Sequence, residues 1–145
     1  MLDGPDLLAR RQAGWQRLLE EPGPRDVNLV AADDGGTIVG LFNAGPARDE
    51  DAGPATAEIM MIYATPGAWG TGVGRGLMTG GLDRLRSAGF GDVLLWVLDS
   101  NDRARRFYER AGFATDGATK DDVVAGTTIR EIRYRRELRV GAHPD

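Results

Sequence analysis

The chain has 145 residues with a formal net charge of −4, and 41% of the residues are hydrophobic, which predicts one folded domain over 1–145. A chain without a basic excess is poorly suited to a phosphate backbone, so we expect no nucleic-acid partner. Cysteine is absent and the one histidine, His143, lies two residues from the end, which excludes disulfides, thiolate nucleophiles and a multi-histidine metal site. We therefore predict that the protein holds no metal.

The start of the chain carries Asp3 and Asp6 and no apolar run, so we expect no secretory signal peptide. No segment of the sequence approaches the roughly 20 apolar residues that a membrane helix needs. Together these features predict a cytoplasmic protein that has no membrane partner.

The first part of the chain predicts a helix and a hairpin. Leucine and tryptophan at three- and four-residue spacings predict a helix over 5–21, which a Pro- and Gly-rich segment ends. The stretches 27–32 and 37–43, joined by an Asp- and Gly-rich turn, predict an antiparallel hairpin. The polar segment 45–54 predicts a mobile loop, in which the acidic run Asp49–Asp51 is expected to be solvated.

In the middle of the chain, strands and helices alternate. The segment 57–64 is apolar except for Glu58 and predicts a central strand that is buried on both faces. Helices are predicted over 77–88 and 102–111, with a second buried strand over 93–98 between them.

The end of the chain predicts two closing strands, over 113–115 and 127–138, and then a flexible tail over 139–145. The last strand carries arginines that suit a solvated sheet edge, namely Arg130, Arg133, Arg135 and Arg136. The whole order predicts a mixed α/β (α+β) domain, with antiparallel pairs at both ends and a strand–helix–strand unit between them.

Glycine is concentrated between Gly67 and Gly81. A helix that begins between Gly72 and Gly76 presents N–H groups that have no intrahelical partner, and pyrophosphate is the usual ligand of such a helix start. The same glycines would also suit a flexible turn with close helix packing. The pattern alone leaves both interpretations open.

Two other phosphate-binding motifs fit the glycines less well. A Rossmann turn follows its strand tightly, whereas seven residues separate Ala64 from Gly72. A Walker A loop needs Gly-Lys-Ser/Thr, and the only lysine of the chain is Lys120. The dinucleotide and triphosphate interpretations are therefore disfavoured.

The segment 94–113 resembles motif B of the GCN5-related N-acetyltransferase (GNAT) superfamily. The resemblance rests on Asn101, Ala104, the pair Phe107-Tyr108 and the pair Gly112-Phe113. The glycine turn in turn resembles motif A of that family, Gln/Arg-x-x-Gly-x-Gly/Ala, with Gly72 and Gly74 as its glycines. Two motifs in the right order extend the resemblance over residues 27–138.

This resemblance implies a mixed central sheet in which two parallel strands splay apart around acetyl-CoA. It implies that backbone groups of the strand before the turn bind the pantetheine arm and that backbone N–H groups of the turn cradle the pyrophosphate. The strand positions are Ile62, Tyr63 and Ala64; the turn positions are Trp69, Gly70, Thr71, Gly72, Val73, Gly74 and Arg75; and Asn101 would lie near the thiol end. Trp69 replaces the family's Gln or Arg, a departure of small cost where the contact is mostly main-chain.

The resemblance also implies an acid for the reaction. An ammonium ion must lose a proton before it attacks the thioester, and the departing thiolate must gain one. Tyr108 corresponds to the family's general acid. Without the motif, a tyrosine at this helical position would be interpreted as a core residue.

The base is less well defined by the sequence. Glu58 is the only carboxylate inside its strand, where burial is costly unless the side chain faces a cleft or is paired, and burial would raise its pKa. It lies fourteen positions before Gly72, a spacing that resembles that of the base in the histone-acetylating branch. In the ribosomal-protein-acetylating branch the base would stand where this chain has Trp96. A structural ion pair at Glu58 and a water relay both stay open.

Members of the family usually begin with a strand and a helix that have no counterpart ahead of the helix predicted over 5–21. We therefore expect a domain that is short at its N-terminus, and an open sheet edge that favours a homodimer. The predicted function is transfer of the acetyl group of acetyl-CoA to a primary amine, of a small molecule or a protein, by direct attack in a ternary complex. The alternative is a non-catalytic acyl-CoA-binding or sensing domain that acts with a partner.

Overall fold

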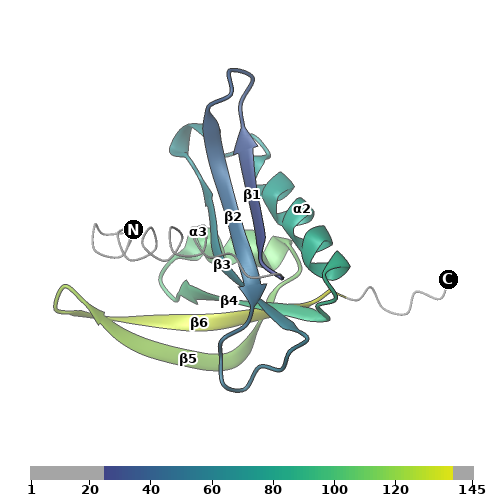
Figure 1. Ribbon diagram of the computed structural model, residues 1–145. Helices are drawn as coiled ribbons and strands as arrows, with labels where there is room; N and C mark the ends of the chain where they lie inside the picture. The colour runs from purple at the N-terminus through teal and green to yellow at the C-terminus, as the bar shows by residue number, and fades with distance from the viewer. Residues whose placement is uncertain (1–24, 139–145) are drawn as a thin grey trace.

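The computed structural model describes residues 25–138, so the helix predicted over 5–21 and the tail predicted over 139–145 lie outside the described residues. The described part holds six strands, two α-helices and one 3-10 helix (Figure 1). In chain order they are β1 Val27–Ala32, β2 Ile38–Pro46, β3 Thr56–Ala64, η1 Pro66–Ala68, α2 Val73–Ser87, β4 Asp92–Leu98, α3 Asp102–Arg110, β5 Ala114–Val124 and β6 Thr127–Glu137.

The strands form one sheet in the order β1-β2-β3-β4-β6-β5. Every neighbouring pair is antiparallel except β3 and β4, which are parallel because α2 connects them. In Figure 1, β4, β5 and β6 run across the lower ends of β1, β2 and β3, so the sheet is strongly twisted. The predicted mixed α/β class and the central strand–helix–strand unit are confirmed.

The parallel pair separates soon after it starts. Only three residue pairs join β3 to β4, and the last of them is Glu58 with Leu94. On its other side, β3 stays paired with β2 as far as Ala64, with a bulge where Asn43 pairs with Met61 and Ala44 with Ile59. A bulge bends the strand that carries the extra residue. Beyond Glu58, β3 and β4 therefore leave a wedge-shaped gap between them.

Two glycines allow α2 to pack closely on the sheet. A Cβ atom at Gly81 would lie 2.3 Å from the ring of Phe42 on β2, and one at Gly40 would lie 2.7 Å from Leu77. The core between α2 and the sheet consists of buried side chains that include Phe42, Leu82, Leu85 and Leu95. The strand predicted as buried on both faces is buried only over Thr56–Ile59; from Met60 to Ala64 it is partly exposed, because this half borders the gap.

The prediction of a solvated edge for the last strand is wrong. β6 lies between β4 and β5, so β5 is the edge of the sheet. The short strand predicted over 113–115 extends to Val124, and most of its side chains are exposed. An edge strand with polar residues on both faces has no period-two apolar pattern, which explains why the sequence did not reveal its length.

Arg133 on β6 is buried, with only 8% of its side chain exposed, and it binds three carboxylates. Its guanidinium donates to Asp49 Oδ2 at 2.9 Å, to Asp51 Oδ2 at 2.8 Å and to Asp116 Oδ2 at 2.7 Å. Asp49 also accepts a hydrogen bond from the Trp96 indole at 3.1 Å. The prediction of a solvated acidic run is thus wrong for Asp49, whose side chain is 17% exposed, whereas Asp51 is exposed as predicted; both hold the β2–β3 loop against β6.

Replacing Arg133 by Met should lower the free energy of unfolding by about 2 kcal/mol. Breaking a fully buried ion pair costs about 3–5 kcal/mol, and we expect less here because Asp51 is 61% exposed and stays hydrated. The control is Arg130→Met on the same strand, whose pair with Asp121 is more than half exposed on both sides and should be worth under about 0.5 kcal/mol. Denaturant unfolding of the three proteins at pH 7 measures both values; equal losses would contradict the prediction.

Candidate active site

A cleft of about 1110 Å³ occupies the gap between β3 and β4. This is slightly more than the roughly 300–1,000 Å³ of most ligand pockets, and suits a long ligand. Residues from β3, β4, α2, α3, β5 and β6 line it. Most of the predicted site residues are among them: Glu58, Ile62, Tyr63, Ala64, Trp69, Gly70, Gly72, Gly74, Arg75, Asn101 and Tyr108.

Two predicted residues do not line the cleft. The hydroxyl of Thr71 donates to the carbonyl of Ala68, so this side chain closes the turn. Val73 packs against the hydrophobic core under α2. The Thr71 N–H also donates to the Ala68 carbonyl, at 3.2 Å, so of these two residues only the backbone N–H of Val73 is left for a ligand.

The glycine turn ends in an exposed helix start. Gly70 and Gly72 have φ angles of +78° and +93°, in the left-handed region that favours glycine. The helix α2 begins at Val73, no side chain caps it, and its first hydrogen bond runs from Gly76 N–H to Gly72 O. The N–H groups of Val73, Gly74 and Arg75 precede that bond. They form a helix start of the kind that suits an anion, and Gly74 and Arg75 line the cleft.

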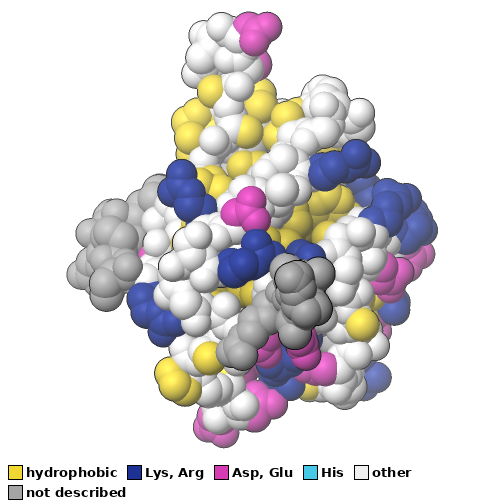
Figure 2. All heavy atoms as spheres, turned by 90° about the vertical axis from the view of Figure 1, so that its right-hand side faces the viewer, with side chains coloured by type: hydrophobic (Ala, Val, Ile, Leu, Met, Phe, Trp, Pro, Cys, Tyr) yellow, Lys and Arg dark blue, Asp and Glu magenta, His cyan; other side chains and the backbone are white. Residues whose placement is uncertain are grey.

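The side of the molecule that carries α2 combines basic and hydrophobic side chains. Figure 2 shows the side that carries α2, where dark blue Lys and Arg side chains lie around an area of yellow hydrophobic ones. Arg75 and Arg103 line the cleft itself. A ligand with an anionic head and an apolar arm would match this combination.

The side chain of Trp69 has a structural role that the sequence did not reveal. Its indole N–H donates to the Ala64 carbonyl at 3.0 Å, and the guanidinium of Arg103 lies 3.7 Å from the centre of its ring. The indole therefore links the end of β3 to the start of α3. One predicted pantetheine contact, the Ala64 carbonyl, already accepts a hydrogen bond.

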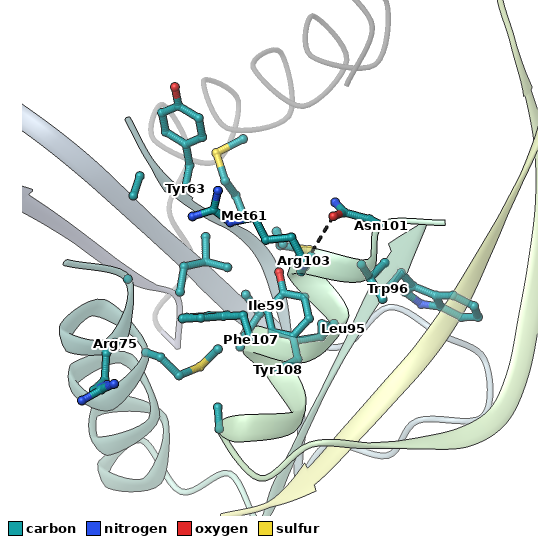
Figure 3. A pocket seen from close by; sticks show the side chains of 18 of the residues that line it. Ile59, Met61, Tyr63, Arg75, Leu95, Trp96, Asn101, Arg103, Phe107 and Tyr108 are labelled. Carbon is teal, nitrogen blue, oxygen red and sulfur yellow. Dashed lines mark hydrogen bonds between the residues drawn. The ribbon is translucent and has the colours of Figure 1, made fainter. Parts of the chain in front are cut away.

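Tyr108 projects from α3 into the middle of the pocket, while Arg75 and Trp96 lie towards opposite ends of it (Figure 3). Its ring contacts those of Phe107, Phe113 and Tyr134, with centroids 5.5, 6.0 and 6.3 Å away.

The helix that carries Tyr108 is held at both ends. The Asn101 side-chain oxygen accepts a hydrogen bond from the Ala104 N–H at 3.1 Å and so caps α3. The hydroxyl of Tyr134 accepts from Arg105 and donates to Glu109, at 2.9 Å each. These contacts anchor α3 at its start and against β6.

Glu58 lies at the closed end of the gap, in the last residue pair between β3 and β4. It is 8% exposed, and one of its oxygens accepts a hydrogen bond from the Arg48 N–H at 3.3 Å. Burial raises the pKa of this carboxyl above its ordinary value, and the negative charge of Asp49 acts in the same direction. Arg48 and Lys120 act in the opposite direction but do not cancel the effect of burial. A carboxylate whose pKa is raised is a stronger base than an ordinary one, which suits it to accept a proton.

Three further cleft residues were not identified from the sequence as part of one site: Trp96, Lys120 and Glu131. The Lys120 Nζ lies 4.1 Å from the centre of the Trp96 ring and 4.0 Å from Glu131 Oε1. They come from β4, β5 and β6, and only the pairing of these strands brings them together.

Within residues 25–138, no group of acidic or histidine side chains is arranged to hold a metal ion. Neither of the two α-helices in this range has the length and apolar character that a bilayer crossing requires.

A sequence model of the acetyltransferase (GNAT) family matches residues 3–113. A mycothiol acetyltransferase of Propionibacterium freudenreichii subsp. shermanii is 40% identical over 86 residues, which cover 59% of this chain and 27% of that protein. The mycothiol acetyltransferase of Thermobispora bispora is 35% identical over 108 residues, covering 70% of this chain and 37% of that protein. The chain thus spans about a quarter to two fifths of the length of these relatives.

Solved structures agree on the architecture. The ribosomal-protein-S18-alanine N-acetyltransferase from Escherichia coli gives a TM-score of 0.70 at 18% identity, covering 88% of this chain and 79% of that one. The structure of yncA from Salmonella typhimurium with acetyl-CoA gives 0.71 at 23% identity, covering 94% and 77%. The fold, with its splayed parallel pair, is that of an acetyltransferase. The chain belongs to the GNAT family of acetyltransferases.

Proposed function

We propose that the chain binds acetyl-CoA in the cleft between β3 and β4 and transfers the acetyl group to a primary amine. The observation that carries this proposal is the separation of β3 from β4 beyond Glu58 and Leu94, which opens a cleft onto the free start of α2. Family membership and the yncA structure with acetyl-CoA support the choice of donor.

The donor would lie along the glycine turn and the exposed half of β3. The N–H groups of Gly70 and of Gly72–Arg75 would bind the pyrophosphate, because the Thr71 N–H already donates to the Ala68 carbonyl. Backbone groups of Ile62–Ala64 would bind the pantetheine arm. The Asn101 side-chain oxygen already caps α3, so its amide nitrogen is the group left for the thiol end. Each contact uses backbone or polar atoms that line the cleft or border the turn.

Tyr108 and Glu58 would handle the two proton transfers. Tyr108 projects into the pocket from α3 and would protonate the departing thiolate. Glu58 lies in the same cleft with a raised pKa and would take the proton of the attacking ammonium, directly or through water. Direct attack in a ternary complex then needs no covalent intermediate on the protein.

Replacing Glu58 by Gln should lower kcat/KM about tenfold at pH 7, less than the 10²–10⁴ of a strict acid–base group, because acceptors that lose their proton in solution bypass the base. The base acts in its ionised form, so wild-type activity should rise as the pH passes through the raised pKa of Glu58. The Glu58→Gln variant should not show this rise. A raised pKa in the folded state also means that the ionised carboxylate destabilises the fold above its unfolded pKa. At pH 8 the variant should therefore unfold at higher denaturant concentration.

The matched control is Glu137→Gln, an exposed carboxylate at the end of β6 outside the cleft. Glu137→Gln should leave both the pH dependence of activity and the denaturant midpoint of unfolding unchanged. If the activity of Glu58→Gln rose with pH as in the wild type, we would assign proton removal to water alone.

The decisive test of the proposed function is the release of free CoA thiol across a panel of amines. The panel includes the acceptor of the mycothiol acetyltransferases, because relatives of that name are 35–40% identical to this chain. Tight CoA binding without turnover on any amine would favour the alternative, a non-catalytic acyl-CoA-binding domain. Homodimerisation stays a prediction, and light scattering that shows a stable monomer would contradict it.

A further inference from the structure

We propose that the chain acetylates its own Lys120, whose ammonium group lies in the cleft as an internal acceptor. The proposal rests on the proposed function, because it uses the same donor and the same two proton-transfer groups. It adds a modification site in the part of the cleft that Trp96, Lys120 and Glu131 line.

Lys120 is the only lysine in the chain, and it lines the cleft. It stands on the edge strand β5, directly opposite Glu131 of β6. Its side chain is 50% exposed, and its Nζ reaches back over the Trp96 ring at 4.1 Å. The one lysine amine of the chain is therefore turned towards the space that also holds Glu58 and Tyr108.

The other basic side chains of the cleft cannot serve as the nucleophile. They are arginines, namely Arg48, Arg75, Arg86, Arg103, Arg110 and Arg136. A guanidinium keeps its proton at any physiological pH, whereas a lysine ammonium can lose one and attack. Among the described side chains that line the cleft, Lys120 carries the only amine that can react.

Lys120 is also lightly held. Its ion pair with Glu131 is 4.0 Å long, with the Lys120 side chain 50% exposed and that of Glu131 19% exposed. Ion pairs that solvent reaches are worth about 0–1 kcal/mol. Its contact with the Trp96 ring adds a similar amount at an exposed site. Arg133, by contrast, binds three carboxylates at 2.9 Å or less. Releasing Lys120 to react costs little, which distinguishes it from a structural cation.

The groups for the reaction face the same space. Lys120 and Glu58 both line the cleft, and the positive charge of Lys120 weakly opposes the burial that raises the pKa of Glu58. Arg48 and Asp49, in the β2–β3 loop, also act on Glu58, with opposite signs. A proton that leaves Lys120 therefore has a carboxylate acceptor in the same site.

The step balances as a simple acyl transfer. The Lys120 ammonium gives one proton to Glu58 or water, and its nitrogen lone pair attacks the thioester carbonyl of acetyl-CoA. The new C–N bond forms, the C–S bond breaks, and the thiolate leaves with a proton from Tyr108, which regains one from the nitrogen as the amide becomes neutral. The products are CoA thiol and a neutral amide at Lys120, which no longer pairs with Glu131. Acetylation would thus remove one positive charge from the part of the cleft beside Trp96 and Glu131.

The test incubates the full chain with acetyl-CoA and no added amine, followed by intact mass and peptide mapping. We expect one acetyl group per chain, at Lys120 and not at the N-terminal amine, formed at a rate independent of protein concentration. Lys120→Arg keeps the charge without a reactive amine and should stay unmodified. Tyr108→Phe should slow the modification at least 100-fold, with CoA binding retained as proof that it is folded.

Three outcomes would overturn the inference. Equal rates in wild type, Tyr108→Phe and heat-unfolded protein would mean uncatalysed acetylation in solution. A rate that rises with protein concentration would mean that one copy modifies another. Thiol release on an external amine with Lys120 unmodified would refute the inference while the proposed function stands; if the chain neither binds CoA nor turns over any amine, both fail.

Discussion

Tyr108→Phe should reduce kcat by about 10³-fold at pH 7, or about 4 kcal/mol, while the affinity for acetyl-CoA stays within a few fold. The reason is that only the hydroxyl can give a proton to the departing thiolate, and acid catalysis contributes about 10²–10⁴ in rate. The ring contacts with Phe107, Phe113 and Tyr134 are kept, so the fold should not change. Thiol release and CoA titration measure the two quantities.

Tyr134→Phe is the matched control, because it makes the same chemical change in the same aromatic cluster. Tyr134 is fully buried, and its hydroxyl is committed to Arg105 and Glu109. Its loss should cost about 1 kcal/mol of unfolding free energy and leave kcat nearly unchanged. If both variants kept full kcat, Tyr108 would be a core residue and the acid would have to be water.

Gly74→Asp should weaken acetyl-CoA binding by at least about 100-fold, which corresponds to about 2.7 kcal/mol. The substitution places a carboxylate in the first turn of α2, where the N–H groups precede the first helical hydrogen bond. There it would bind these groups itself and repel the pyrophosphate, and at about 4 Å such a repulsion is worth several kcal/mol near a protein surface. Calorimetric titration with CoA measures the loss.

Gly74→Asn separates charge from size. A Cβ atom at this position would lie 3.3 Å from the Phe107 ring, so both variants crowd α3 to the same extent. We expect Asn to weaken binding less than about tenfold, and the gap between Asn and Asp to shrink as salt screens the repulsion. Equal losses would show that crowding of Phe107, not the anion site, controls affinity.

Much of the fold follows from short-range pattern. The strand over Val27–Ala32 was predicted with its observed bounds, and the helix Asp102–Arg110 within one residue. The helix predicted over 77–88 begins four residues earlier, at Val73, and includes the glycines of the first turn. Glycine lowers helix propensity, so pattern alone placed the start too late.

The sequence by itself determined the parts of the site that depend on neighbours along the chain. The glycine-rich turn before α2 and the motif asparagine before α3 act within a few residues of their own position, so residue identity along the chain was enough to indicate them. Glu58 and Tyr108 could be named in the same way, one as a carboxylate in an apolar strand and one through its motif. The cleft lining includes both.

Only the tertiary structure decided which strands lie beside each other. Placing β6 between β4 and β5 buries Arg133 under Asp49 and Asp51, and it brings Lys120 over Trp96. The early separation of β3 from β4 opens the cleft that both motifs face. Strand order and splay depend on pairing between residues far apart in the chain, and local propensity carries no information about such pairing.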